Sequence, residues 1–245
     1  MSAAGAIAGR SLSPKAPRRV GTTRPASAFT LLELLVVAGL TAAFSVVLIR
    51  GLGGGGQSAA LQSAQATLAN LVSLARTKAM ASGQSSRLLV HVDVGSSSQP
   101  LRYLRLVAVQ TQASGGWQTI TDAYLPDGVY VVPGNFTVTP AGLFSAVSWT
   151  RADGSALRST ALRSNQISTE TIDGPAAEQW VSVTISAAAG TAQSGDLILA
   201  PGRLRPPGSY LPGESPVVLD NPDGVRGLTL SAYGVPALIN ARNGF

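Results

Sequence analysis

Residues 57–94 read QSAALQSAQATLANLVSLARTKAMASGQSSRLLVHVDV, and the spacing of apolar residues changes once within this stretch. Up to Ser82 the apolar residues recur every three or four positions, which is the spacing of one face of an α-helix. Gly83 follows at a position where glycine commonly ends a helix. From Leu88 to Val94 apolar residues occupy alternate positions, as in a β-strand. The stretch therefore predicts a helix over 57–83 that leads into a β-rich domain.

The predicted helix has two different faces. One face is apolar and is expected to pack on a sheet; it consists of Leu61, Ala64, Leu68, Leu71, Val72, Ala75 and Ala79. The other face is polar and is expected to be partly solvated; it carries Gln62, Gln65, Asn70, Ser73, Arg76 and Thr77. This division is typical of a helix that lies on the surface of a globular domain.

Many short β-type runs follow the helix as far as the carboxyl terminus, and Asp-Gly pairs at 127, 153, 173 and 223 separate several of them as turns. The predicted strands are Leu88–Val94, Leu101–Thr111, Trp117–Ile120, Val129–Val132, Phe136–Thr139, Ser145–Thr150, Trp180–Ser186, Asp196–Leu199, Val217–Leu219, Gly227–Ser231 and Pro236–Ile239. The first two are expected to form a hairpin. Five prolines and three glycines in Pro201–Pro216 predict an exposed loop over about residues 200–216. We therefore expect residues 84–245 to form a mainly antiparallel, sandwich-like head domain of an α+β fold.

An apolar run lies upstream of the helix. Residues Phe29–Ile49 read FTLLELLVVAGLTAAFSVVLI, and Glu33 is the only charged residue among these 21. As a helix the run would extend about 31 Å, close to the hydrocarbon thickness of a bilayer. We predict a transmembrane helix over residues 29–50.

Glycine follows this run in unusual density. Gly51, Gly53, Gly54, Gly55 and Gly56 come directly after Arg50. Each glycine costs about 1 kcal/mol in a helix interior relative to alanine. We expect a hinge over residues 51–56, between the two predicted helices.

Positive charge is concentrated before the apolar run. The chain has 18 basic and 12 acidic residues, and its first 28 residues contain five of the basic residues and no acidic one: Arg10, Lys15, Arg18, Arg19 and Arg24. The remaining 13 basic and 12 acidic residues nearly balance, so the excess of charge does not point to nucleic acid. A basic flank marks the cytoplasmic side of a membrane span. We therefore expect a cytoplasmic leader over 1–28 and an exported carboxyl-terminal part.

The residues around the start of the run admit several interpretations. Ala26-Ser27-Ala28 resembles a signal-peptidase site, but in an ordinary signal peptide the small residues follow the apolar region. An uncleaved signal anchor and a late cut near Ala60 remain alternatives. Locally, Thr30 and Glu33 have the spacing of a helix capping box.

The sequence from Ala28 through Phe29-Thr-Leu-Leu-Glu33-Leu-Leu-Val-Val37 resembles the prepilin signal of type IV pilins and type II secretion pseudopilins. The resemblance implies that prepilin peptidase cuts between Ala28 and Phe29, that the new amino group of Phe29 is methylated, and that the apolar run remains as an assembly helix. In that family the carboxylate at the position of Glu33 sets the register against the amino terminus of a neighbouring subunit. Implied partners are the peptidase, other pilin or pseudopilin subunits, an inner-membrane assembly platform and membrane lipid.

Residues Leu68–Val90 are similar to the GspH/FimT group of minor pseudopilins and minor pilins, through an L-A-R-x-x-A-x-x-x-G pattern followed by a strand. Here the pattern comprises Leu74, Ala75, Arg76, Ala79 and Gly83. The resemblance implies a single-pass inner-membrane protein with a periplasmic head, which enters a secretion pseudopilus or a type IV pilus as a minor subunit.

Features of an enzyme are weak in this sequence. It has no cysteine and a single histidine, His91, and it contains no phosphate loop, nucleophile elbow or metal-ligand spacing. We expect no catalytic activity, cofactor or metal. The aromatic residues Trp117, Trp149, Trp180, Tyr103, Tyr124 and Tyr130 are expected to lie in the core.

A second class of function remains open, namely an exported binding domain that is anchored in the membrane and never polymerises, such as an adhesin or a DNA-uptake subunit. Arg203 and Arg205, in the predicted Pro/Gly-rich loop, are the candidate residues for a weak contact with nucleic acid.

Overall fold

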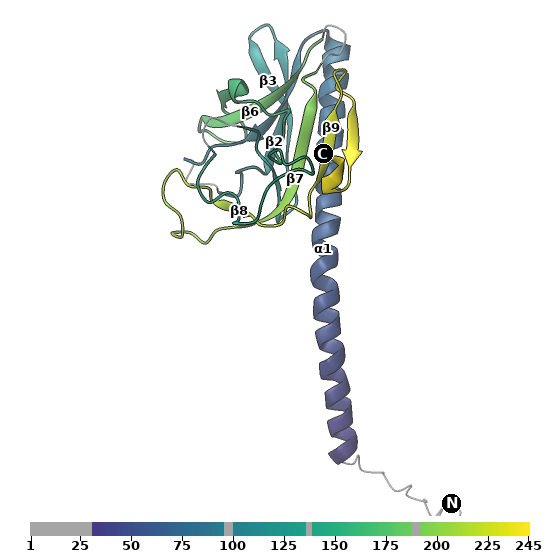
Figure 1. Ribbon diagram of the computed structural model, residues 1–245. Coiled ribbons are helices and arrows are strands. Elements are labelled where there is room, and N and C mark those ends of the chain that lie inside the picture. Colours follow the sequence, from purple (N-terminus) through teal and green to yellow (C-terminus); the bar gives the residue numbers. More distant parts are fainter. Residues whose placement is uncertain (1–30, 96–99, 136–138, 188–191) are drawn as a thin grey trace, which may run out of the picture. The chain divides into compact units, whose positions relative to one another are not determined.

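In the computed structural model of the chain, residues 31–95, 100–135, 139–187 and 192–245 are described. The chain divides into two compact units, residues 1–48 and 49–245. The described residues form one long α-helix, two short 3₁₀ turns and ten strands, which makes the fold α+β (Figure 1).

The helix α1 spans Leu31–Ser82 without interruption. Residues 51–56, over which the sequence predicts a hinge because of their glycines, are helical. Hydrogen bonds along the backbone are available to glycine as to any residue, so the cost of about 1 kcal/mol per glycine weakens a helix without ending it. Bending at these glycines stays a prediction.

The carboxyl-terminal end of α1 lies where the sequence predicts it. Gly83 has φ +65°, the left-handed conformation that ends many helices and that glycine adopts without steric cost. The hydroxyl of Ser82 donates to the carbonyl oxygen of Lys78 at 2.7 Å and accepts the amide of Gln84 at 3.2 Å. These contacts lead the chain out of the helix and into the first strand.

Two antiparallel sheets make up the head. In the larger sheet the strand order is β3 (Gly116–Tyr124), β2 (Leu106–Ala113), β1 (Ser86–His91), β6 (Glu178–Ile185) and β5 (Ile167–Glu170). In the other sheet the order is β10 (Pro236–Ile239), β9 (Arg226–Leu230), β7 (Gly195–Leu204) and β4 (Val129–Val131), and β8 (Val217–Leu219) pairs with β7. The 3₁₀ turns are η1 (Ser164–Gln166) and η3 (Arg242–Gly244). The predicted hairpin is confirmed as β1 paired with β2, with Leu88 opposite Val109.

One predicted strand is wrong, one lies mostly outside the described residues, and one observed strand is not predicted. The segment 145–150 is not a strand; it forms a single bridge, Thr150 to Ala156, and its Trp149 is buried, so its apolar pattern reflects core packing by a loop. β5 was not predicted, because its sequence ISTE lacks an apolar alternation and it pairs only through β6. Of the segment predicted at 136–139, the first three residues lie outside the described residues.

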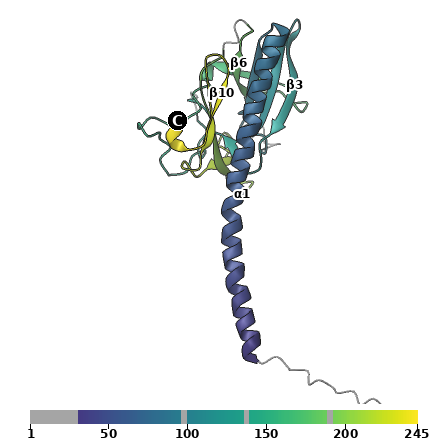
Figure 2. The same cartoon turned by 90° about the vertical axis from the view of Figure 1, so that its right-hand side faces the viewer.

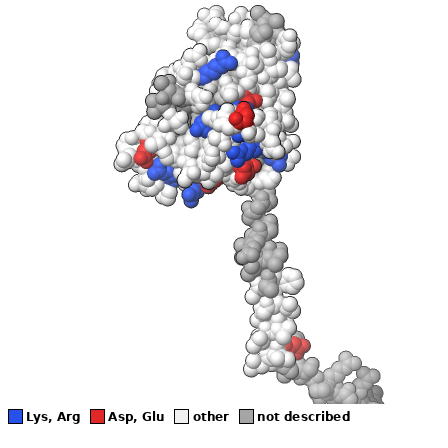
Figure 3. All heavy atoms as spheres, viewed as in Figure 1, with Lys and Arg blue, Asp and Glu red and all other residues white. Residues whose placement is uncertain are grey.

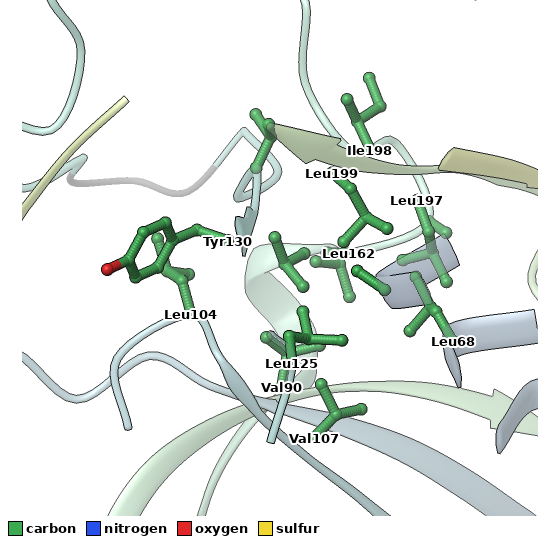
Figure 4. Packing of buried hydrophobic residues seen from close by; sticks show 14 of the residues in the cluster. Leu68, Val90, Leu104, Val107, Leu125, Tyr130, Leu162, Leu197, Ile198 and Leu199 are labelled. Atoms are coloured by element: carbon green, nitrogen blue, oxygen red, sulfur yellow. The ribbon is translucent and has the colours of Figure 1, made fainter. Parts of the chain in front are cut away.

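The core lies between the two sheets and the second half of α1. All seven residues of the predicted apolar stripe, from Leu61 to Ala79, are buried, which confirms that prediction. Figure 4 shows Leu68 of α1, Val107 of β2 and Leu197 of β7 among the residues of this core. In Figures 1 and 2 the strand β10 lies beside this half of the helix. The helix is thus a structural element of the head.

A smaller apolar cluster lies apart from the main core and comprises Leu89, Leu106, Ala108, Ile172 and Trp180. It explains why β1 is buried at all six positions instead of alternating between core and solvent as its sequence suggests.

The expected burial of the aromatic residues is correct in four of six cases. Trp149, Trp180, Tyr103 and Tyr130 are buried. Trp117 is half-buried and Tyr124 is exposed. Both of these lie in β3, which is an edge strand of the larger sheet, and an edge strand leaves side chains in contact with solvent.

Candidate functional site

The start of α1 exposes large apolar side chains at successive positions. Leu31 is 84% exposed and Val36, the least exposed of the set, is 51% exposed. The set comprises Leu31, Leu32, Leu34, Leu35, Val36, Val37, Leu40 and Phe44. Since neighbouring positions of a helix point in different directions, these side chains cover the helix on every side. The described part of this segment is almost entirely white in Figure 3, which marks uncharged residues.

Glu33 is the acidic residue of the first turn of α1. A carboxylate in this position interacts favourably with the positive end of the helix dipole. The predicted cleavage and methylation site, Ala28 and Phe29, and the predicted cap residue Thr30 lie outside the described residues. The prediction that Glu33 sets the register of assembly therefore stays a prediction.

Thr41 is the polar side chain in the middle of this apolar segment. Its hydroxyl donates to the carbonyl oxygens of Val37 at 3.0 Å and Ala38 at 2.9 Å. Such bonds within the helix satisfy the hydroxyl without a partner from outside. Thr41 is therefore compatible with apolar surroundings.

Among the described residues, no helix has a stretch that is long and apolar enough to cross a membrane. The predicted span over 29–50 includes Phe29 and Thr30, which lie outside the described residues, as do the side chains of 45–50.

The second half of α1 is attached to the β9–β10 hairpin by polar contacts. The side-chain Nε2 of Gln65 donates to the carbonyl oxygens of Gly227 at 2.6 Å and Ile239 at 2.9 Å, and Gln65 is 3% exposed. The guanidinium of Arg76 donates to the carbonyl oxygen of Tyr233 at 3.0 Å. Gln65 was expected to be solvated, and this is wrong, because the hairpin covers it. The helical period alone does not show which element lies against the polar face.

Three buried polar side chains, Arg102, Glu178 and His91, lie beside the smaller apolar cluster and contact the half-exposed Asp173. Nη1 of Arg102 donates to Oε2 of Glu178 at 2.8 Å, and its Nη2 lies 3.1 Å from Oδ2 of Asp173. The same Asp173 oxygen accepts the hydroxyl of Tyr124 at 3.0 Å. Nε2 of His91 lies 3.3 Å from Oε2 of Glu178. No sequence pattern predicts this group, because Arg102 and Glu178 are 76 positions apart and come together only through the pairing of β1 with β6.

His91 is fully buried, and its ring meets that of Trp180 edge-on, with the ring centroids 5.1 Å apart. Burial lowers the pKa of His91; Arg102 lowers it further, whereas Glu178 and Asp93 act in the opposite direction. The lowered pKa keeps the imidazole neutral at pH 7. Within the described residues no group of three His, Cys, Asp or Glu side chains has the arrangement of a metal site.

Arg203 and Arg205 have different surroundings. The side chain of Arg203 is 75% exposed and belongs to β7, which extends four residues into the segment predicted as a loop. The side chain of Arg205 is 20% exposed, pairs with Glu214 at 3.2 Å and donates to the carbonyl oxygen of Ser209. Arg205 therefore holds the following loop together instead of extending into solvent. Basic and acidic side chains are interspersed on the face of the head seen in Figure 3. A contact with nucleic acid stays a prediction.

The fold defines the class of the molecule as an α+β protein with a long helix and mainly antiparallel sheets. Neither a model of a known protein family nor the sequence of a curated protein matches the chain. Two solved structures of EpsH, a minor pseudopilin from the type 2 secretion system of Vibrio cholerae, are similar to it. The first has 17% identity and a TM-score of 0.38 over 74% of this chain and 96% of that one. The second has 15% identity and a TM-score of 0.37 over 74% and 94%. Because these TM-scores are low, the function proposed below rests on the residues of this chain.

Proposed function

We propose that the chain is a minor pseudopilin-like or pilin-like structural subunit that assembles through the first part of α1. The observation that carries the proposal is the continuity of α1 between two kinds of surface. Residues 31–44 expose apolar side chains, whereas Leu61–Ala79 supply the stripe that packs in the head. One helix therefore connects a folded head to a segment that needs apolar surroundings.

Exposed apolar surface of this extent is unusual for a soluble monomer and marks a site of association with lipid or protein. A bilayer and a bundle of like helices both supply such surroundings. Leucine and valine around the full circumference suit a helix that passes from lipid into contacts with several neighbours. We propose that residues 29–50 first anchor the chain in the inner membrane, with the head in the periplasm, and then form the centre of a filament.

Glu33 is the residue of this segment for which we propose a specific role. After a cut between Ala28 and Phe29, the new amino group would lie four residues, about 6 Å of helix, from the Glu33 carboxylate. A carboxylate in apolar surroundings is costly unless a cation is near. We propose that the amino terminus of a neighbouring subunit supplies that cation during assembly, so that the ion pair fixes the register between helices.

The partners that follow from this role are prepilin peptidase, further pilin or pseudopilin subunits and an inner-membrane assembly platform. The role is structural and requires no catalytic residue or cofactor. The competing function is an exported binding domain that stays anchored and never polymerises.

Substitution of Glu33 separates the two functions. Glu33→Leu should leave insertion into the membrane unchanged, because it makes the segment more apolar. Incorporation into filaments should fall at least about tenfold, since a buried cation without its partner is strongly destabilising. Both quantities can be measured in the same cells by membrane fractionation and by cross-linking of sheared filaments.

Asp122→Leu provides the matched control, because Asp122 is an exposed acidic residue of β3 in the head. This variant should enter both the membrane and the filament as the native chain does. Normal incorporation of Glu33→Leu would remove the proposed register role.

A further inference from the structure

A polar hollow opens on the head between β4 and η1. It has a volume of about 220 Å³ and is lined by Asn135, Arg158, Thr160, Leu162, Arg163 and Ser164. Two arginines, two hydroxyls and an amide therefore surround one space, and none of the lining residues is acidic. This composition is unlike that of the rest of the head, where most arginines pair with a carboxylate.

Arg158 is held in a fixed orientation at this hollow. Its guanidinium lies over the ring of Phe144, 3.7 Å from the ring centroid, and Nη1 donates to the carbonyl oxygen of Leu157 at 2.9 Å. Within the described residues no carboxylate forms an ion pair with it. Burial lowers the pKa of Arg158 with no opposing contribution from a carboxylate. A partly desolvated guanidinium with unused donors is a strong attractor for an anion.

The backbone that carries these donors is fixed to the sheet. The hydroxyl of Ser159 accepts the amide of Ile198 at 2.9 Å and donates to the carbonyl oxygen of Val132. The hydroxyl oxygen of Thr160 accepts the amide of Asp196 at 2.8 Å, which leaves the hydroxyl hydrogen of Thr160 available to a ligand. Arg158 and Thr160 are therefore held in place before any ligand arrives, which reduces the entropy lost on binding.

Asp196, whose backbone amide contacts Thr160 of the hollow, is paired with another arginine. Asp196 lies 2.9 Å from the guanidinium of Arg151 and accepts the hydroxyl of Thr229 at 2.6 Å. Arg163 is exposed and has no ion pair within the described part of the chain. The two arginines of the hollow thus contribute two positive charges without a matching carboxylate.

We infer that this hollow binds a phosphate group. A phosphate dianion matches the two positive charges of Arg158 and Arg163, whereas a carboxylate would leave one of them unmatched. The hollow has five donor side chains around one space, so its ligand must accept hydrogen bonds from several directions. The tetrahedral oxygens of phosphate do so, whereas a carboxylate accepts mainly in its own plane. The volume exceeds that of several waters, at about 30 Å³ each, and falls below the usual size of pockets for whole drug-sized molecules. It therefore suits one phosphate group, free or at the end of a larger molecule.

Calorimetric titration of the full chain in detergent with inorganic phosphate tests the inference. Arg163→Gln should weaken the affinity for phosphate about tenfold, as expected for the loss of a charge-assisted hydrogen bond. Arg158→Gln should weaken it at least as much. Lys78→Gln removes an exposed positive charge of α1 outside the hollow and should leave the affinity unchanged. Circular dichroism of each variant checks that the fold is retained, and Arg163→Gln, at an exposed position, keeps the test valid if Arg158→Gln does not fold.

Absence of saturable phosphate binding would overturn the inference, as would equal affinity in the native chain and Arg163→Gln. Acetate bound as tightly as phosphate would also overturn it, in favour of a carboxylate partner.

Glycerol 3-phosphate distinguishes two sources of the ligand. Competition at an affinity similar to that of phosphate would identify an esterified phosphate, such as a sugar phosphate or lipid headgroup, and much weaker competition would identify free phosphate. The inference does not depend on the proposed assembly.

Discussion

At the scale of single residues, buried polar side chains decide details of the head that an amphipathic pattern does not predict. Gln65 and His91 occupy positions in a helix and a strand that have ordinary periodicity. Their roles depend on partners far along the chain: Gly227 and Ile239 for Gln65, and Glu178 for His91. Such contacts follow from strand register, which a single sequence specifies only weakly.

His91 should make the stability of the head depend on pH. Its pKa is lowered in the folded chain, so the unfolded chain binds a proton more readily. The contribution of the neutral His91 to the free energy of unfolding is fully present above the unfolded pKa of about 6.5. It is lost as the pH falls below that value, by at most about 1.4 kcal/mol per pH unit. Urea denaturation at constant ionic strength between pH 7 and pH 5 should show this loss.

His91→Asn provides the comparison, because it removes the only histidine of the chain. The variant should be less stable at pH 7 but should lose less stability between pH 7 and pH 5 than the native chain does. If the free energy of unfolding fell equally with pH in the two chains, carboxylates and not His91 would govern the pH dependence between pH 7 and pH 5.

At the scale of elements, the sequence predicts a helix or strand best where a regular spacing of apolar residues matches one buried face. The stripe from Leu61 to Ala79, the helix end at Gly83 and the pairing of the first two strands were all predictable. β5 was not, because an edge strand with polar residues carries little periodic signal. In the candidate assembly segment, the apolar composition was predictable, and its exposure on every side is what the structure adds.

The glycine run is helical, but it should be the least stable part of α1. We expect the backbone amides of 51–56 to exchange with solvent faster than those of 64–79, because each glycine costs about 1 kcal/mol relative to alanine. The double substitution Gly54→Ala and Gly55→Ala should slow exchange there by the equivalent of about 2 kcal/mol. Hydrogen exchange read by mass spectrometry measures both.

Gly39→Ala is the control for that experiment. Gly39 also lies in α1, and a Cβ there would contact nothing within 4 Å, so the change should not affect exchange at 51–56. Exchange at 51–56 as slow as at 64–79 in the native chain would contradict the proposed hinge.

At the scale of the whole molecule, α1 continues from a segment with exposed apolar side chains into a folded antiparallel head. Composition and periodicity were sufficient for the α+β class, because they reflect burial averaged over many residues. They were not sufficient for the buried charged group, because Arg102 meets Glu178 from a distant part of the chain. They were not sufficient for the phosphate-sized hollow either, because loop residues without periodicity line it. The proposed filament role adds a requirement that neither composition nor fold can supply, which is a defined mature amino terminus.

The amino-terminal residue of the mature protein tests this requirement most directly. Intact-mass measurement and amino-terminal sequencing of the chain purified from membranes should find a protein that begins at Phe29 and carries a methyl group on its amino nitrogen. This result would place Glu33 four residues from a cationic amine, as the assembly mechanism needs. A mature chain that retains Met1, or one that begins near Ala60, would contradict the account.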